Sequence, residues 1–271
     1  MGGRLLLTLF TMDPQILLLL LLTTFCGQGA DAMPVTYNYD PTSPYGPEHW
    51  GTLLPQWQLC NNGNEQSPIA IDIPHTAINQ SLGSLQYMYN NTSDGVLVNT
   101  GHTIQVNFAA GAGSLVLGSD SYNLKQLHFH TPSEHVINNV RFPLEMHMVH
   151  QTSDGQKLAV IGVVFWESCG GHFLDQFWGS LPDVTTNGAS VPIGPLSFEK
   201  LHIGPTYARY PGSLTTPPCT QNVSWTVELS QWNTVSKSQL DALASIITEP
   251  NARPLQQNIG IVELNSFDGF T

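Results

Sequence analysis

The chain has 271 residues and a formal net charge of −12, with 24 Gly, 19 Pro and only 10% charged side chains. A chain this acidic repels phosphate backbones, which argues against nucleic-acid binding. Low charge together with many turn-forming residues favours a β-rich globular protein over a disordered one.

The N-terminal residues have the pattern of a targeting segment. Residues 16–25 form an apolar run that is shorter than the roughly 20 residues needed to span a bilayer. Small residues follow and end in Ala30-Asp31-Ala32, which resembles a signal-peptidase site. We therefore predict a secretory signal peptide over residues 1–32 and one domain over residues 33–271, with Met1 and Met12 both possible starts.

A membrane anchor is the competing interpretation of this apolar run. No second long apolar run occurs, and the chain ends NSFDGFT, without the hydrophobic tail of a lipid-anchor signal. The sequence therefore predicts no membrane span. The expected location is outside the cell, or in an organelle that the secretory pathway reaches.

The rest of the chain is dominated by strand signals. Residues 37–57 are aromatic and broken by Pro and Gly, which predicts an irregular arm over a core. SDG at 93–95 and at 153–155 predicts turns between strands. Short apolar alternations predict strands at residues 96–100, 102–108, 114–118, 124–130, 144–150 and 158–166. The last run is apolar on both faces, which is typical of a central strand.

Helix signals are few. Ser236 and Gln239 have the spacing of a capping box, and apolar residues follow at helical spacing, so residues 237–248 predict an amphipathic helix. Residues 172–181 predict a second helix. With so few helices, the chain is predicted to form one β-dominated domain.

Three cysteines remain once Cys26 is removed with the signal peptide: Cys60, Cys169 and Cys219. An odd number in a secreted protein indicates one disulfide and a spare thiol, or an intermolecular bond. N-glycosylation sequons also fit a secretory route. They begin at Asn79, Asn90, Asn91 and Asn222.

Residues 124–135 read LKQLHFHTPSEH and contain three of the ten histidines. Residues two apart on a strand point the same way. A strand here would therefore place Gln126, His128 and His130 on one face, while Leu127 and Phe129 face an apolar core.

Residues 144–150, LEMHMVH, supply a third histidine. On a strand, Glu145, His147 and Val149 would share one face. Three imidazoles leave a fourth zinc position open for water, which is typical of a catalytic site. Gln126 and Glu145 could hold the outer ring nitrogens of His128 and His147. The alternative is that these are ordinary strand histidines; the spacing itself favours zinc, with hydrolytic or hydrating chemistry.

Segments along most of the chain point to one known family. These segments are GPEHW (46–50), QSPI (66–69), GHT (101–103), QLHFHTPSEH (126–135), LEMHMVH (144–150), YPGSLTTPPCTQNVSW (210–225) and ARP (252–254). With them the chain resembles the α-class carbonic anhydrases, most of all the secreted type of plants and bacteria, from about Tyr39 to Gln256. SLTTPP together with QLHFH and SEH is the most specific part.

The resemblance implies a fold and an activity. The implied fold is mainly β: a single domain on a large, mostly antiparallel twisted central sheet with a few short peripheral helices. The implied activity is zinc-dependent reversible hydration of carbon dioxide to bicarbonate and a proton, by zinc-hydroxide attack with a histidine proton shuttle. The implied partners are carbon dioxide and bicarbonate, with sulfonamides and small anions as inhibitors, and the protein would be a monomer or dimer.

The resemblance also implies roles for individual residues. The Zn²⁺ ligands would be His128, His130 and His147, with Gln126, Glu145 and the backbone of Asn251 as their outer partners. The catalytic residues would be Thr215, Glu134, the shuttle His102 and Tyr39, which orders water. The substrate would contact Thr216, Leu214, Val149, Val160 and Trp225. Cys60 and Cys219 would form the disulfide of secreted members.

Some positions depart from the family pattern. Thr100 and Gln105 stand where many members have Asn near the shuttle, and Thr131 replaces a common tryptophan. Two other functions remain possible. Plant relatives of this scaffold include storage or binding proteins, some of which lose a zinc ligand, whereas here all three histidines are present. An unrelated secreted zinc hydrolase is the other alternative, but the chain has no H-E-x-x-H motif.

Overall fold

The fold is organised around two long antiparallel neighbours, β7 (Asp120–His130) and β10 (Leu144–Thr152). The computed structural model describes residues 36–230 and 233–266. The predicted signal peptide over residues 1–32 lies outside these residues. Among the described helices, none has the length and apolar character needed to cross a membrane.

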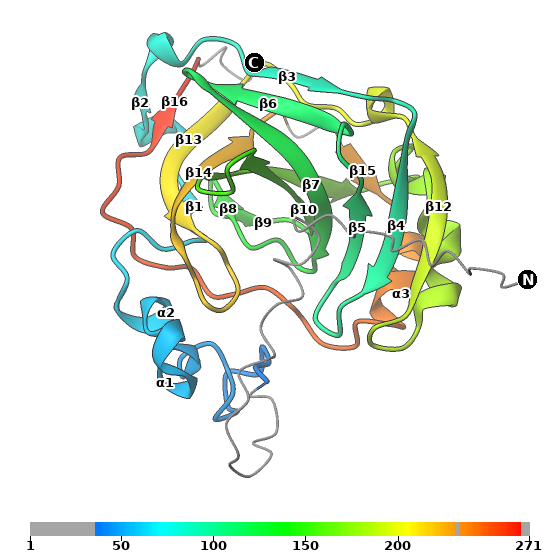
Figure 1. Cartoon of the computed structure of the whole chain (residues 1–271). Helices are drawn as coiled ribbons and strands as arrows, with labels where there is room; N and C mark the ends of the chain where they lie inside the picture. Colours follow the sequence, from blue (N-terminus) through cyan, green and yellow to red (C-terminus); the bar gives the residue numbers. More distant parts are fainter. Residues whose placement is uncertain (1–35, 231–232, 267–271) are drawn as a thin grey trace, which may run out of the picture. The chain divides into compact units, whose positions relative to one another are not determined.

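A large sheet of 13 strands dominates the described part of the chain, and Figure 1 shows β7 and β10 side by side within it. Its main order is β12-β4-β5-β7-β10-β11-β14-β13-β16-β2. Most neighbours are antiparallel, but β11 runs parallel to β14 and β15, and β16 runs parallel to β2. The mainly β fold class and the mostly antiparallel sheet are confirmed.

The remaining strands of the large sheet are β2 (Ala77–Ile78), β3 (Gln86–Tyr89), β4 (Ser93–Asn99), β5 (Ile104–Phe108), β6 (Gly113–Leu117), β11 (Leu158–Glu167), β12 (Ser190–Leu196), β13 (Tyr207–Ser213), β14 (Gln221–Glu228), β15 (Asn233–Val235) and β16 (Glu263–Leu264). A three-stranded sheet contains β1 (Ala70–Ile71), β8 (Val136–Ile137) and β9 (Val140–Arg141).

The helices are short. The α-helices are α1 (Trp50–Leu53), α2 (Leu59–Asn62) and α3 (Lys237–Ala244), and the 3₁₀ helices are Pro55–Trp57, Ile73–His75, Gln80–Leu82, Leu174–Gln176, Trp178–Val184 and Phe198–Lys200. The predicted capping box is present, because the Ser236 hydroxyl accepts from the Gln239 N–H and the Gln239 side chain accepts from the Ser236 N–H. The helix ends at Ala244 rather than 248, since β-branched residues and Pro250 follow.

Two local predictions differ from the structure. Residues 172–181 form two 3₁₀ segments instead of one α-helix, and Pro182, which has no N–H, lies inside the second. SDG at 93–95 is not a turn but the beginning of β4, since the chain turns earlier, at Asn90. Gly95 is buried against β5, where a Cβ would lie 2.6 Å from Val106 Cγ1, so this glycine serves close packing.

The two faces of the long strands pack into separate apolar clusters. Leu127, Phe129, Met146 and Met148 lie in the larger cluster, as the alternation of β7 and β10 predicts. The opposite face of β11 joins a second cluster that contains Val160 and Trp225. Buried apolar side chains on both faces confirm β11 as a central strand.

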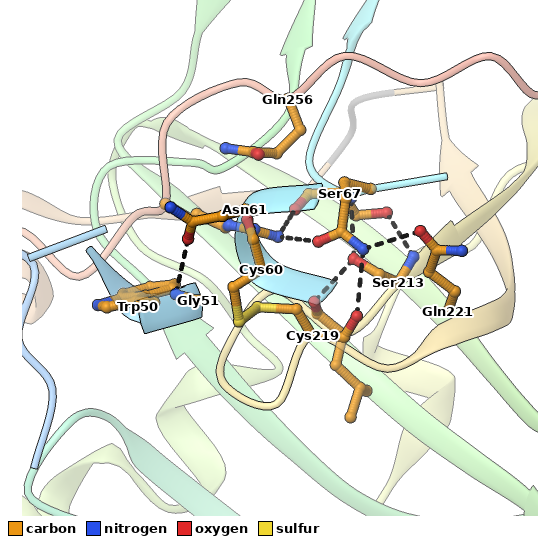
Figure 2. Close-up of a disulfide and its surroundings, with 12 residues drawn as sticks. Trp50, Gly51, Cys60, Asn61, Ser67, Ser213, Cys219, Gln221 and Gln256 are labelled. Atoms are coloured by element: carbon orange, nitrogen blue, oxygen red, sulfur yellow. Dashed lines mark hydrogen bonds between the residues drawn. A yellow bond between two sulfur atoms is a disulfide. The ribbon is translucent and has the colours of Figure 1, made fainter. Parts of the chain in front are cut away.

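The segment before the sheet is an irregular arm with short helical turns, as predicted. A disulfide joins Cys60 of α2 to Cys219 (Figure 2). Cys169 is a free, exposed thiol. The buried Arg253 guanidinium also fastens the arm. It donates to the carbonyl oxygen of Cys60 at 2.7 Å and lies over the Trp50 ring at 5.7 Å. The arm is thus held to two distant parts of the chain.

The disulfide is expected to contribute substantially to stability. Because Cys60 and Cys219 are 159 residues apart, their bond restricts the unfolded chain strongly. The double variant Cys60→Ser, Cys219→Ser should lose about 2–5 kcal/mol of unfolding free energy in denaturant titrations. Cys169→Ser is the matched control and should unfold like wild type. Equal stability of all three proteins would contradict this expectation.

Candidate metal centre

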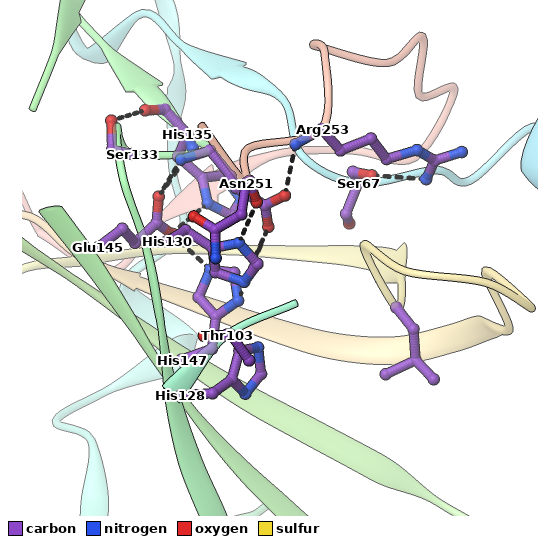
Figure 3. A network of polar contacts seen from close by, with 12 residues as sticks. Ser67, Thr103, His128, His130, Ser133, His135, Glu145, His147, Asn251 and Arg253 are labelled. Atoms are coloured by element: carbon purple, nitrogen blue, oxygen red, sulfur yellow. Dashed lines mark hydrogen bonds and ion pairs between the residues drawn. The ribbon is translucent and has the colours of Figure 1, made fainter. Parts of the chain in front are cut away.

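The register of β7 and β10 brings the three predicted histidines together. His128 lies directly opposite His147, and His130 lies opposite Glu145. Because side chains alternate along a strand, all three imidazoles project from the same face of the pair. Figure 3 shows the three rings gathered in one place. Ring centroids are 5.0 Å apart for His128 and His130, and 4.6 Å apart for His130 and His147.

Each imidazole has one nitrogen held by a neighbour. His128 Nδ1 lies 2.8 Å from Gln126 Oε1, and His147 Nε2 lies 2.8 Å from Glu145 Oε1. The third partner is a backbone group, since His130 Nδ1 donates to the Asn251 carbonyl oxygen at 2.7 Å. These contacts fix the ring orientations, as outer partners of metal ligands do.

The remaining ring nitrogens fit a metal ion. One nitrogen from each of the three histidines lies within 4.8 Å of the others. His130 Nε2 is buried and makes no hydrogen bond among the described residues, which is costly unless a metal takes up its lone pair. Burial lowers the pKa of His130 to about 4 and also lowers the pKa values of His128 and His147. The rings are therefore uncharged at neutral pH, each with one N–H and one free lone pair, which is the form that binds metal.

Glu145 is the most heavily bonded group beside the histidines. Its Oε1 receives the ring N–H groups of His147 and His135, and its Oε2 receives the backbone N–H groups of Glu134 and His135, all at 2.6–2.8 Å. Burial acts to raise the pKa of Glu145, but His135 and His147 together lower it well below the usual range. Glu145 is thus a buried carboxylate that stays ionised.

A second buried carboxylate, Glu134, faces the same histidines. Its Oε2 lies 3.5 Å from His130 Nε2 and 3.8 Å from His147 Nδ1, while its Oε1 accepts from the Arg253 N–H at 2.7 Å. Burial raises the pKa of Glu134 to about 7, and contact with the Thr215 hydroxyl acts in the opposite direction. Oε2 makes no hydrogen bond of regular geometry among the described residues.

The predicted shuttle residue lies against an aromatic wall. The His102 ring stacks on Tyr37, with centroids 4.1 Å apart and an angle of 12° between the planes. The Tyr37 hydroxyl contacts both Thr216 and Tyr39, and burial raises its pKa to about 12. A small cavity of about 170 Å³, lined in part by Tyr39, His102 and Asn251, lies on this side. The structure therefore places His102, Tyr39 and Thr216 in one neighbourhood.

The predicted apolar contacts lie beside His147. Val160 and Trp225 are buried in the second cluster, and Val149 and Leu214 pack against it partly buried. The Trp225 ring centroid is 4.8 Å from that of His147. An apolar surface thus borders the histidines on one side.

The four sequons differ in accessibility. Asn90 and Asn222 are exposed. Asn91 is half-buried and bonds Glu199 and the Phe198 N–H, and the half-buried Asn79 bonds Glu263.

Three residues near the histidines carried no assigned role from sequence. His135 joins Glu145 to the Tyr210 hydroxyl, at 2.6 and 2.7 Å. Tyr37 stacks on His102, and Arg253 bonds Glu134 through its backbone. His135 is adjacent to Glu134 in the SEH motif and could have been suspected from it. No local pattern marks Tyr37, because its partner lies 65 residues away.

Comparisons with known proteins agree with this geometry. The model of the eukaryotic-type carbonic anhydrase family matches residues 45–263. Alpha carbonic anhydrase 7 of Arabidopsis thaliana is 39% identical over 225 residues, covering 81% of each chain. Dioscorin DB3L of Dioscorea polystachya is also 39% identical, over 230 residues, covering 81% of this chain and 82% of its own.

Solved structures show the same two kinds of relative. Dioscorin complexed with ascorbate has a TM-score of 0.80 and 38% identity, covering 85% of this chain and 98% of its own. The α-carbonic anhydrase from Thermovibrio ammonificans, in complex with the inhibitor sulfanilamide, has a TM-score of 0.76 and 33% identity, covering 84% and 98%.

The four hydrogen bonds of Glu145 predict a large cost for an amide at this position. In Glu145→Gln, an NH₂ group in place of Oε2 would face two backbone N–H donors. An NH₂ group in place of Oε1 would keep its bonds only if His135 and His147 both changed tautomer, and the charge of the carboxylate is lost in either orientation. The metal-free protein should lose about 3 kcal/mol or more of unfolding free energy. Glu199→Gln, at an exposed site that also accepts one side-chain bond, is the control. Equal destabilisation by the two changes would contradict the buried-charge argument.

Proposed function

Because this chain belongs to the eukaryotic-type, α-class carbonic anhydrase family, we propose that it catalyses the reversible hydration of carbon dioxide to bicarbonate and a proton. The observation that carries this proposal is the complete set of three converging imidazoles, each with its second nitrogen already held. The three free ring nitrogens lie close enough together for one ion to bind all of them.

The chemistry of the donors favours zinc. Three neutral nitrogen ligands leave one coordination position for water or substrate. When bound by His128, His130 and His147, zinc supplies a Lewis acid that lowers the pKa of water, the well-known property of carbonic anhydrases. Its positive charge would also lower the pKa of nearby Glu134, which keeps that carboxylate ionised.

Thr215 and Glu134 orient the attacking oxygen. The ionised Glu134 accepts the Thr215 hydroxyl proton in a hydrogen bond, which leaves the threonine oxygen free to accept from the nucleophile. That arrangement points a lone pair of the nucleophile toward carbon. The Arg253 N–H on the other carboxylate oxygen holds Glu134 in place, so orientation is set before substrate arrives.

The apolar side of the site receives carbon dioxide. This surface consists of the side chains of Val149, Val160, Leu214 and Trp225, whose apolar atoms form no hydrogen bonds and so suit an uncharged, linear substrate. The polar indole N–H of Trp225 already donates to the Ser213 carbonyl oxygen at 2.8 Å. Thr216 lies at the border between this surface and the polar side. Aromatic sulfonamides and small anions would compete at the metal, and sulfanilamide is the inhibitor in the Thermovibrio complex.

His102 carries the proton away. An imidazole with a pKa near neutrality can exchange protons with buffer, and burial lowers the His102 pKa below the usual value. Stacking on Tyr37 fixes the ring plane. The hydroxyls of Tyr37, Tyr39 and Thr216 form a polar path along which water can be ordered between His102 and the histidine cluster.

A storage or binding protein on the same scaffold is the second candidate function. Dioscorins match this chain as well as the plant carbonic anhydrases do, and one of them is solved with ascorbate. Zinc content and turnover separate the two, because a binding protein needs neither. For either function we propose passage through the secretory pathway, after removal of residues 1–32, with glycans on the exposed Asn90 and Asn222.

The zinc assignment predicts a defined loss on mutation. Mature protein should contain about one zinc per chain and hydrate carbon dioxide in stopped-flow assays, with inhibition by a sulfonamide. His130→Ala should lower zinc affinity by several orders of magnitude and remove most activity, because one of three ligands is lost. His75→Ala, at an exposed surface pair with Asp72, should change neither. Full zinc occupancy in His130→Ala would sink the ligand assignment.

The shuttle and the orienting threonine predict different kinetics. His102→Ala should lower kcat in dilute buffer and leave kcat/KM almost unchanged, because proton release follows bicarbonate formation. Added imidazole should restore much of the loss. Thr215→Ala should lower kcat/KM itself, and imidazole should not help. A His102→Ala protein that loses kcat/KM like Thr215→Ala and ignores imidazole would remove the shuttle role.

A further inference from the structure

We propose that the side chain of Asn251 is a positioning residue that holds the backbone on both sides of His130, and with it the geometry of the metal ligands. The inference rests on the proposed zinc site. It concerns the carboxamide of Asn251 and is separate from its backbone carbonyl, which already accepts from the His130 ring.

The carboxamide makes three hydrogen bonds, all to backbone groups. Its Nδ2 donates to the carbonyl oxygens of Phe129 at 3.0 Å and His102 at 2.9 Å. Its Oδ1 accepts from the Thr131 N–H at 2.7 Å. Phe129 and Thr131 are the two neighbours of His130 in the chain, so the amide spans this ligand from one side to the other.

This contact is needed because strand pairing ends at this point. On the β5 side, the ladder between β5 and β7 stops at Gln105 and His128. The backbone from Phe129 to Thr131 therefore has no partner strand there, although β10 still pairs with His130 on the other side. Buried backbone groups without a partner are costly. The Thr103 hydroxyl bonds both the N–H and the carbonyl oxygen of Phe129. The Asn251 amide adds a second donor to that carbonyl oxygen and supplies the acceptor for the Thr131 N–H in place of a strand.

The amide is itself firmly placed. Asn251 is 2% exposed, and its backbone N–H donates to the Thr131 carbonyl oxygen at 3.1 Å. Two residues later the Arg253 N–H bonds Glu134. These bonds fix residues 251–253 along residues 129–134. Asn251 therefore acts on His130 in two ways: its backbone carbonyl orients the ring, and its side chain positions the backbone. The His102 carbonyl is fastened to the same amide.

The chain offers a matched control in Asn265. This residue is 8% exposed, and its side chain makes the same three kinds of bond: Nδ2 donates to two carbonyl oxygens, and Oδ1 accepts from the Tyr207 N–H at 2.8 Å. The carbonyls belong to Gly83 at 3.2 Å and Pro205 at 2.8 Å. None of these bonds involves a histidine of the proposed site or its sequence neighbours. Asn251→Ala and Asn265→Ala therefore remove equal numbers of equivalent bonds at two places.

The test measures metal release, not turnover. Wild-type, Asn251→Ala and Asn265→Ala proteins are loaded with zinc, and zinc transfer to a chromogenic chelator is followed over time. Loss of an outer partner typically costs 10–100-fold in metal affinity, so Asn251→Ala should release zinc at least about tenfold faster than wild type. Asn265→Ala should release zinc at the wild-type rate even if its melting temperature falls. Cobalt(II)-substituted Asn251→Ala should also show an altered visible absorption spectrum, and Asn265→Ala an unaltered one.

Asn251→Asp covers the case in which the alanine variant does not fold. The carboxylate keeps the size of the side chain and the acceptor for Thr131, but it cannot donate to the two carbonyl oxygens. It should therefore also release zinc faster. Zinc release and cobalt spectra like those of Asn265→Ala, in either Asn251 variant, would overturn the inference alone. A wild-type protein that holds no zinc would overturn the proposed function and this inference with it.

Discussion

The antiparallel register between β7 and β10 is the constraint on which the rest of the site depends. It sets His128 against His147 and His130 against Glu145. A slip of one residue would send one set of side chains to the opposite face of the sheet, where Leu127, Phe129, Met146 and Met148 fill the larger core. The apolar side chains on one face therefore secure the position of the imidazoles on the other.

Burying polar groups around these strands costs desolvation free energy, which many short hydrogen bonds offset. Glu145 receives four N–H donors, and the Arg253 guanidinium donates to the backbone of the arm and to Gln66. Removing such charges from water is expensive unless each is well bonded. The atoms left without regular hydrogen bonds include His130 Nε2 and Glu134 Oε2, both directed at the centre of the site. Two of the six such buried atoms among the described residues therefore lie where a metal would bind.

The same scaffold carries carbonic anhydrases and dioscorins among the relatives of this chain. Fold similarity by itself cannot choose between catalysis and binding, because function resides in the side chains placed on a fold. Here those side chains come from strands near the middle of the sheet, from the loop before β5 and from the irregular segment around Asn251. The disulfide and Arg253 bring the N-terminal arm to the same region, so Tyr37 reaches His102.

The sequence by itself determined the strands that carry the histidines, because alternation with period two is visible in LKQLHFH and LEMHMVH and the apolar partners decide which face is buried. The capping box of α3 was equally readable, since it needs only residues three apart. The turn predicted at 93–95 was wrong, because Gly95 serves packing against β5, which no local pattern reveals. Only the tertiary structure decided the stacking of Tyr37 on His102, the contact of Arg253 with Glu134 and the bonds of the Asn251 amide. These pairs are separated by 65 to 149 residues, so no local pattern contains both partners of any of them, and each contact forms only when the fold brings the two distant segments together.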